Sequence, residues 1–478
     1  MRTLLLNPPS FENFDGGAGA RYPARREVCS FWYPTWLAYP AGLIQESRLL
    51  DAPAHSIKPE ETVRIAGDYE FVVLFTSTAG FASDVRLTEK IKATKQSPKI
   101  AFVGPHVSVL PEESLKASPA IDFIVRREFD YAVAEFAGGK NLEEIRGITY
   151  RKNDRIFHNP ERPLLEDLDA LPFAVEIYKR DLDISRYNIP FLHYPYISFY
   201  TSRGCPAMCS FCLWPQTFGG HRWRTRSSDN TVAEVRRAQE LFPQVKEIFF
   251  DDDTFTWGKS RVLELCQKLK PLKLTWSCNA RVTADYETLK AMKEAGCRLL
   301  IVGFESGDPT ILKNIKKGAT VDQALTFMKN CRSLGITVHG DFQLGLPGET
   351  RETIEKTIVF AMELDPKTIQ VSMSHPYPGT ELHQYLKNQG YLISTDLTDD
   401  QGHQLPTFEY PDLSQEEILK SVENFYARYY FRPRIIFRIA RRALFDGTER
   451  RRLYQEGKDF LKLRAKRKGF VRSGKSKE

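Results

Sequence analysis

The sequence has little cysteine and no long hydrophobic run. Eight cysteines in 478 residues are too few for a secreted, disulfide-rich scaffold. The first residues, MRTLLLNPPS, are too short and too soon interrupted by proline to form a signal peptide. No run of about 18 apolar residues occurs, so we expect no membrane-spanning helix. These absences favour a cytoplasmic protein with reduced thiols.

Net positive charge is confined to one end of the chain. Residues 428–478 carry 18 Lys and Arg against 5 Asp and Glu, although the net charge of the whole chain is only +7. Phe, Ile and Tyr alternate with these arginines, a composition that fits an anionic membrane surface. RNA phosphates are an alternative partner, but no RNA-binding module is recognisable. A third interpretation is that the tail beyond Lys458 is simply solvated and binds nothing. We therefore expect peripheral association with the inner face of the membrane and no nucleic acid.

The N-terminal part alternates strand and helix patterns. Apolar, β-rich runs at 3–9, 71–80, 99–106 and 121–126 enclose amphipathic stretches such as 83–95, which predicts an α/β domain with a doubly wound, Rossmann-like parallel sheet. Ligands in this architecture bind at the carboxyl ends of the strands. The residues expected there include Thr76, Ser77, Thr78, Gly104 and His106. A hairpin turning at Asn153-Asp154 and a linker follow.

A second alternation begins near residue 197. Six strand candidates lie at 197–201, 246–251, 274–279, 299–304, 337–344 and 368–374, and helical patterns fill the gaps between them. Six β/α units predict a partial (β/α)6, TIM-like barrel, in which chemistry gathers at the carboxyl ends of the strands. Polar residues recur at those ends, whereas the strands themselves are apolar. The stretch after 411 predicts a basic helical region.

Three cysteines follow the first of these barrel strands, in the stretch S-R-G-C-P-A-M-C-S-F-C-L-W-P over 202–215. A structural zinc site uses four protein ligands, and the other cysteines form no second C-x2-C pair: Cys29, Cys266, Cys278, Cys297 and Cys331. Three thiolates on a [4Fe–4S] cluster leave one iron open for a substrate or cofactor. A chance grouping of cysteines and a zinc site completed from a distance are the alternatives. We expect Cys266 and Cys331 to be buried thiols in helices.

Cys205, Cys209 and Cys212, in C-x3-C-x2-C spacing after a barrel strand, resemble the motif of the radical S-adenosylmethionine (radical SAM) superfamily. The resemblance implies that the open iron chelates SAM, whose reductive cleavage gives a 5′-deoxyadenosyl radical. It also implies a reductant such as flavodoxin or ferredoxin. Further roles carried over by motif are Phe211 beside the cluster, Asp252 or Asp253 for the SAM amino group, Arg281 for its carboxylate and Glu305 near the ribose. The string G-L-P-G-E-T at 345–350 resembles a turn of the same family.

The N-terminal part resembles the B12-binding domain that precedes such barrels, on N-P-P, S-T-A-G, V-G-P-H and D-F-I-V-R-R-E-F. The resemblance implies a cobalamin site at Thr76, Ser77, Thr78 and Gly104. The cobalt-ligating D-x-H-x-x-G motif is absent, and D-A-P-A-H-S at 51–56 has the wrong spacing. Two interpretations therefore stay open: cobalamin without a lower histidine ligand, or no cobalamin.

The stretches 14–22 and 30–41 resemble a subgroup associated with hopanoid biosynthesis and implicated in forming the cyclitol ether of bacteriohopanetetrol. The resemblance implies an enzyme that contracts an amino sugar on a hopanoid lipid head group. A cobalamin-dependent radical methylase of a lipid or tetrapyrrole, and a non-enzymatic cobalamin or redox sensor, are the alternatives. We expect a B12-binding-like domain over 1–140, a hairpin and linker over 141–190, the radical SAM barrel over 191–410 and the basic region over 411–478.

Overall fold

The computed structural model describes residues 1–11, 31–394 and 407–438. Its first sheet has the order β2-β1-β3-β4-β5-β6-β7, with β1 to β5 parallel and the last two strands antiparallel. The strands are β1 (Thr3–Asn7), β2 (Ser47–Asp51), β3 (Phe71–Phe75), β4 (Lys99–Val103), β5 (Phe123–Val125), β6 (Ile148–Lys152) and β7 (Arg155–His158). The doubly wound sheet expected from the sequence is confirmed.

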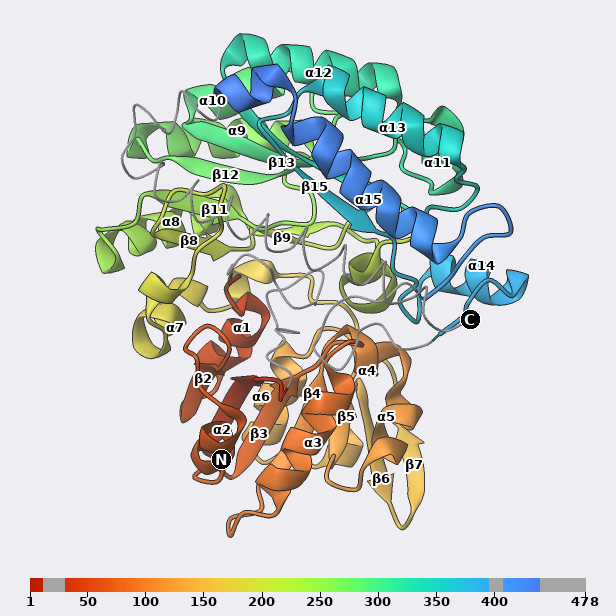
Figure 1. Ribbon diagram of the computed structural model, residues 1–478. Coiled ribbons are helices and arrows are strands. Elements are labelled where there is room, and N and C mark those ends of the chain that lie inside the picture. Colours follow the sequence, from red (N-terminus) through yellow and green to blue (C-terminus); the bar gives the residue numbers. More distant parts are fainter. Residues whose placement is uncertain (12–30, 395–406, 439–478) are drawn as a thin grey trace.

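Helices cover both faces of this sheet (Figure 1). They are α1 (Thr35–Leu43), α2 (Pro59–Ala66), α3 (Phe81–Lys92), α4 (Pro105–Val109), α5 (Pro111–Ala117) and α6 (Asp130–Ala137). Every residue of β1 and β3 is buried, as in a sheet packed on two sides. Leu4 and Leu6 face the core that contains α2 and α3, whereas Leu5 faces the core that contains α1 and α6.

The hairpin formed by β6 and β7 belongs to the first sheet, which we did not expect. It turns at Asn153 and Asp154, both with positive φ, as its sequence predicts. We expected it in a connecting region, but β6 pairs with β5, so the first sheet continues to His158. Strand β2 was not expected at all.

The second sheet has the order β15-β14-β13-β12-β11-β8, all parallel. Its strands match the six expected ones: β8 (Tyr196–Phe199), β11 (Glu247–Phe250), β12 (Trp276–Ala280), β13 (Cys297–Glu305), β14 (Thr337–Leu344) and β15 (Thr368–Met373). The helices around it are α7 (Ala174–Asp181), α8 (Ser228–Leu241), α9 (Lys259–Leu269), α10 (Tyr286–Glu294), α11 (Pro309–Asn314), α12 (Val321–Leu334), α13 (Arg351–Leu364) and α14 (Glu381–Gln389). The partial (β/α)6 barrel is confirmed.

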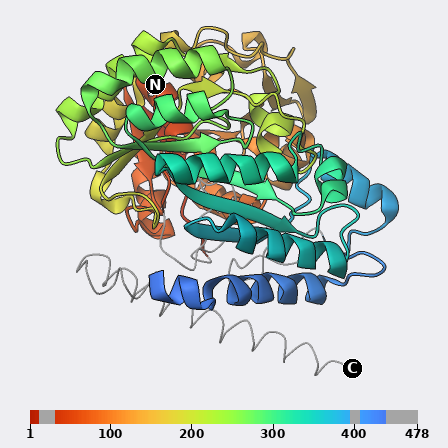
Figure 2. The ribbon, with the colours of Figure 1, turned by 90° about the horizontal axis from the view of Figure 1, so that it is seen from above.

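Helix α15 (Gln415–Tyr430) lies along the edge strand β15 and beside α13 (Figure 2). The Tyr426 hydroxyl accepts a hydrogen bond from the Val371 N–H at 2.8 Å, and the Tyr430 hydroxyl accepts one from the Ile369 N–H at 3.1 Å. Two tyrosines one helical turn apart thus satisfy backbone groups that an open sheet edge leaves unpaired.

Among the helices of the described residues, none combines the length and the apolar character that a membrane span requires. The glycine-rich stretch 14–22 and most of the basic region, from 439 on, lie outside the described residues.

Candidate functional site

The carboxyl ends of the two sheets face each other. Ala79, after β3, packs against Leu213 of the cysteine loop and Tyr377, which follows β15. Helix α4 contacts the π-helical turn η4 (Pro215–Gly219), and Figure 1 shows α4 at the end of the first sheet that points toward the second. The two edges that the sequence marks as ligand-binding therefore enclose one region.

A short antiparallel ribbon holds the cysteine loop. Strand β9 (Ser202–Arg203) pairs with β10 (Arg224–Thr225) on either side of it. Gly204 has φ +82°, and a side chain there would lie 2.3 Å from the Arg222 carbonyl oxygen, so this position requires glycine. The loop leaves the ribbon with Cys205 at its start.

Cys205 and Cys209 are buried, Cys212 is half-buried, and none of the three forms a disulfide. Burial, with the Asp253 carboxylate adding to it, raises the pKa of Cys205 above its usual value. In the described residues no three His, Cys, Asp or Glu side chains meet closely enough to hold a single metal ion. Phe211, between the second and third cysteines, is buried in the main core.

Two side chains that we did not single out from the sequence bind the carbonyl groups of this loop. The Gln216 amide donates to the carbonyl oxygens of Cys209 at 3.1 Å and Cys212 at 2.8 Å, and to that of Ser210 at 3.2 Å. His221 Nδ1 lies 3.2 Å from the Cys205 carbonyl oxygen. These contacts fix the backbone path that spaces the three thiols.

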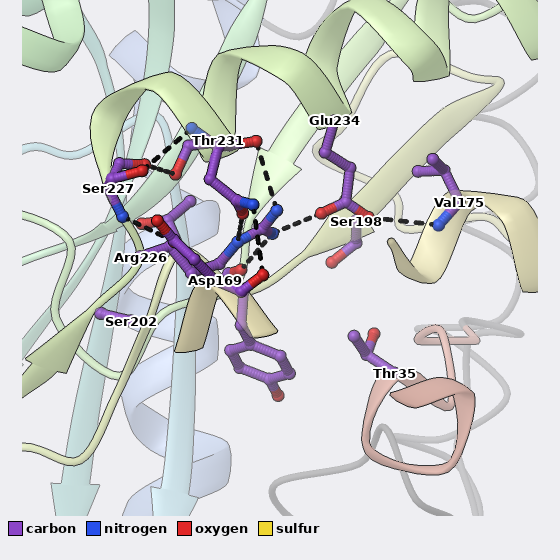
Figure 3. A network of polar contacts seen from close by, with 12 residues as sticks. Thr35, Asp169, Val175, Ser198, Ser202, Arg226, Ser227, Thr231 and Glu234 are labelled. Carbon is purple, nitrogen blue, oxygen red and sulfur yellow. Dashed lines mark hydrogen bonds and ion pairs between the residues drawn. The ribbon is translucent and has the colours of Figure 1, made fainter. Parts of the chain in front are cut away.

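A buried ion pair anchors the end of β8, from which the loop departs (Figure 3). Arg226 pairs with Glu234 of α8 and donates to the Tyr200 carbonyl at 3.2 Å. Glu234 also accepts from the Val175 N–H of α7 at 3.2 Å. Both charged side chains are at most 5% exposed, so each depends on the other for its counter-charge.

The structure separates the two aspartates after β11. Asp252 is fully buried and accepts hydrogen bonds from the Thr201 N–H at 2.5 Å, the Thr201 hydroxyl and the Ser202 N–H at 3.1 Å. The Asp252 carboxylate thus links the end of β11 to the end of β8 by hydrogen bonds. Asp253 is half-buried, and its charge acts on Cys205. Of the two candidates, Asp253 is the one whose charge acts on the cysteine loop.

Arg281 follows β12 and lies near the same cysteine, on which its charge also acts. Its Nη2 donates to the Lys317 carbonyl, and its Nε is buried with no hydrogen-bond partner. A buried guanidinium N–H without a partner is costly. This group is therefore available to an anionic ligand.

Glu305 ends β13 with φ +65°, at a point where the register to β14 shifts. Its Oε1 accepts from Lys317 Nζ at 2.7 Å and its Oε2 from Gln343 Nε2 at 3.0 Å. A side chain on Gly303 would lie 2.3 Å from Glu305 Oε1. Lys317, which no motif in the sequence marks, thus belongs to the site.

The expected cobalamin residues divide into two groups. The Thr76 hydroxyl donates to Asp84 at 2.7 Å, and Ser77 Oγ accepts from the Gly80 N–H at 3.2 Å. A side chain on Gly104 would lie 2.4 Å from the Thr76 carbonyl oxygen. These three residues shape the turns after β3 and β4, whereas Thr78 is half-buried at the edge.

His106 is the second residue of the short helix α4 and packs on Phe81 with ring centroids 4.3 Å apart. Burial lowers its pKa to about 4, so the ring is neutral, and its Nδ1 is buried with no hydrogen-bond partner. The strand order 2-1-3-4-5 places the topological switch point between β1 and β3, where this architecture binds its ligand.

The two domains meet through a buried ionic network. Arg203, next to the cysteine loop, donates to Asp130 at 2.7 and 3.0 Å, and Arg224 donates to Glu128 at 2.8 and 2.9 Å. Both arginines come from the β9–β10 ribbon, and both acids follow β5. The network therefore ties the ribbon that carries the cysteines to the first sheet.

Aromatic rings extend the same contact. The Arg203 guanidinium lies over the ring of Trp36 in α1, with 4.3 Å between Arg203 Cζ and the ring centroid. The same ring stacks with Trp214, with 6.1 Å between the two ring centroids. Trp36 also meets Phe218 edge-on at 4.6 Å. The cysteine loop is thus packed between its own barrel and the N-terminal domain.

Comparison with known proteins identifies both parts of the chain. Residues 199–361 match the radical SAM superfamily model, and residues 23–137 match the B12 binding domain model. A protein of Pyrococcus horikoshii described as an uncharacterized methyltransferase is 31% identical over 460 residues, covering 92% of this chain and 94% of its own. The hopanoid C-2 methylase of Rhodopseudomonas palustris is 26% identical, covering 83% of this chain and 72% of its own.

Among solved structures, the radical SAM methyltransferase TsrM of Kitasatospora setae, with cobalamin and a [4Fe–4S] cluster bound, superposes with a TM-score of 0.66. The two chains are 16% identical, and the match covers 90% of this chain and 89% of TsrM. This likeness extends over both domains, and at such an identity it shows the fold. The two family models and the full-length relationship to the Pyrococcus protein lead to one conclusion: this chain belongs to the radical SAM superfamily, is an enzyme with a [4Fe–4S] cluster and SAM as cofactors, and carries a B12-binding domain ahead of its radical SAM domain.

Proposed function

We propose that this chain is a cobalamin-dependent radical SAM methyltransferase. The observation that carries the proposal is the 31% identity, over nearly the whole of both chains, to a protein described as a methyltransferase. The facing carboxyl edges of the two sheets support it, because they bring the expected cobalamin edge beside the cysteine loop. Methyl transfer, the alternative to sugar ring contraction in the expectations from sequence, is the better supported of the two reactions.

Cys205, Cys209 and Cys212 would hold the cluster. Gln216 and His221 fix their loop, and the raised pKa of Cys205 means that iron must displace its proton on binding. When bound, the cofactors supply one electron from the cluster and a methyl group that cobalamin carries from SAM to substrate.

The polar groups near these cysteines fit SAM. Arg281 would bind its carboxylate, because the guanidinium offers a buried Nε–H without a partner. Asp253 would accept from its ammonium group, since Asp252 is occupied by the end of β8. Glu305, held by Lys317 and Gln343, would accept from a ribose hydroxyl, and Phe211 would line the adenine side.

Cobalamin would lie at the switch point of the first sheet. Thr78 and the unpartnered Nδ1 of His106 are polar groups that this edge offers. Thr76, Ser77 and Gly104 would act through the shape of their turns, because their polar atoms are engaged within the domain.

The test is anaerobic reconstitution with iron, sulfide and hydroxocobalamin, followed by SAM labelled in its methyl group. A bacteriohopanetetrol-linked amino sugar and a magnesium porphyrin are the two probes. The proposal predicts labelled product together with S-adenosylhomocysteine. Formation of 5′-deoxyadenosine without methyl gain in either probe contradicts methyl transfer.

As a second candidate function, we propose ring contraction of an amino sugar on a hopanoid head group. It rests on the resemblance of residues 14–22 and 30–41 to a hopanoid-associated subgroup. The similarity to a hopanoid C-2 methylase supports a lipid substrate. Loss of the cyclitol ether from a deletion strain, with accumulation of the amino sugar, would favour this reaction, and an unchanged lipid profile would exclude it.

Association with the membrane surface would accompany a lipid substrate. Beyond α15 the described chain exposes Ile436 (49%) and Phe437 (69%) beside Arg434. The basic stretch continues to the end of the sequence. A protein truncated after residue 438 should sediment less with vesicles that contain anionic lipid, whereas equal sedimentation of both proteins would contradict the proposal. Truncation there retains the two tyrosines that cap β15.

A further inference from the structure

The loop between α11 and α12, residues 315–319, joins the separate parts of the site. The Ser210 N–H of the cysteine loop donates to the Ile315 carbonyl at 3.0 Å. Arg281 donates to the Lys317 carbonyl, and Lys317 Nζ donates to Glu305. One short loop therefore contacts the cysteine loop and the ends of two different strands.

Lys317 places a cation in the site, with its side chain largely shielded from solvent. Its side chain is 11% exposed and its Nζ lies 2.7 Å from Glu305 Oε1. Any side chain at Gly303 would come within 3.0 Å of that nitrogen, so the missing side chain makes room for the pair. Burial alone would lower the pKa of Lys317, but Glu305 and the Cys209 thiol outweigh it and hold the pKa above its usual value. The amine therefore stays charged.

The lysine lies near two predicted cofactor contacts at once. Its nitrogen holds Glu305. Its loop lies against the cysteine loop, because the Ser210 N–H, next to Cys209, donates to the Ile315 carbonyl, and the charge of Lys317 acts on Cys209. The adjacent Lys316 points away, since it pairs at 2.6 Å with Glu381 on the surface and is 53% exposed. Two neighbouring lysines of the same loop thus differ in whether they reach the site.

We propose that Lys317 is a positioning residue that holds Glu305 for SAM and places a fixed positive charge beside Cys209, where it favours the reduced cluster. The inference rests on the proposed cluster and SAM sites. Reduction adds negative charge to the cluster, so a nearby cation raises its midpoint potential. An acid held by one ion pair and one amide also loses less freedom when it binds a hydroxyl.

A lysine that only neutralises Glu305 would leave the cluster unaffected. The two roles can be separated because Lys317→Arg keeps the charge and changes the hydrogen-bond geometry, whereas Lys317→Met removes both. Glu305→Gln removes the carboxylate charge and keeps an acceptor. Lys316→Met is the matched control, since it alters the same loop without reaching the site.

The experiment uses the reconstituted full chain and two readouts: the midpoint potential of the cluster from EPR-monitored redox titration, and the Kd for SAM. We expect Lys317→Met to shift the potential to a more negative value and to weaken SAM binding about tenfold, the loss of one charge-assisted contact. Lys317→Arg should keep the wild-type potential, and Lys316→Met should match the wild type in both readouts. Combining Lys317→Met with Glu305→Gln should weaken binding by less than the product of the single effects.

The inference is overturned if Lys317→Met has the wild-type potential and the wild-type Kd, or if Lys317→Arg shifts the potential as much as Lys317→Met does. A wild-type chain that takes up no [4Fe–4S] cluster contradicts the proposed function itself, and with it the premise of the inference. Cluster content, measured as iron and sulfide per chain before each titration, tells these failures apart.

Discussion

Arg203 forms a bidentate ion pair with Asp130, with both N–H···O distances at or below 3.0 Å, across the boundary between the two domains. The arginine stands two residues before Cys205, and the aspartate begins α6 of the other domain. Both side chains are at most 3% exposed. The position of the cysteine loop is therefore set in part by the N-terminal domain.

Asp130→Ala should lower the free energy of unfolding by about 3 kcal/mol, because it leaves the Arg203 charge buried without its main partner. The matched control is Glu166→Ala, whose pair with Arg222 has both side chains more than half exposed and should cost no more than about 1 kcal/mol. Urea denaturation measures both. Equal, small losses for the two variants would show that the buried pair does not stabilise the domain contact.

Gln216→Glu should reduce cluster uptake. The new carboxylate cannot donate to the carbonyl groups of Cys209, Ser210 and Cys212, and it would repel all three. Loss of a supporting residue of this kind typically weakens metal binding by roughly 10–100-fold. Iron and sulfide per chain after limiting reconstitution provide the measurement. Gln384→Glu, on the surface of α14, is the control, and equal iron content in the two variants would refute the role of Gln216.

The stability of the protein should depend on pH through Glu349. This residue lies just before α13, where its Oε2 accepts from the Leu346 N–H at 3.4 Å, and burial raises its pKa from 4.5 to about 8. Between these two values the native protein keeps a proton that the unfolded chain has released. The free energy of unfolding should therefore fall as pH rises through this window.

Glu349→Gln removes this titration and keeps an oxygen acceptor, so its unfolding free energy should vary less between pH 5 and pH 8 than that of the wild type. Chemical denaturation at four or five pH values in this range makes the comparison. Parallel pH profiles for the two proteins would exclude Glu349 as the source of the slope.

Tyr426→Phe should destabilise the edge of the barrel. It removes the acceptor for the Val371 N–H and leaves that group beside an apolar ring, at a cost of about 1–3 kcal/mol. The variant should also aggregate more readily on heating, since it exposes part of a strand edge. Tyr286→Phe, at a ring that is 49% exposed, serves as control. A Tyr426→Phe protein as stable as this control would show that the edge is satisfied in another way.

Much of the fold could be predicted from local pattern. Apolar runs ending in polar residues located all six barrel strands, because a strand in a parallel sheet is buried on both faces. Strand β2, with the sequence SRLLD, was missed because its Ser47 and Arg48 are not buried and its apolar run is two residues long. The hairpin was recognised from its turn, but its pairing with β5 is a tertiary contact without a local signal.

The kind of cofactor could be predicted from the sequence, but the roles of the individual side chains could not. The spacing of the cysteines indicates the cofactor, but nothing local distinguishes Asp252 from Asp253, because their directions depend on how the chain turns after β11. Lys317 stands in a K-K-G string typical of a surface loop, and only its burial against Glu305 reveals it. The Arg203–Asp130 pair joins residues 73 positions apart.

SAM turnover by the anaerobically reconstituted chain, with dithionite as reductant, is the central test of the cluster assignment. We expect the wild type to convert SAM to S-adenosylhomocysteine or 5′-deoxyadenosine. Cys205→Ala should form neither product above background, whereas Cys266→Ala, which alters a buried thiol in α9 away from the loop, should retain the activity. Equal turnover by Cys205→Ala and the wild type, or none by any of the three proteins, would contradict the assignment of the three cysteines to the cluster that activates SAM.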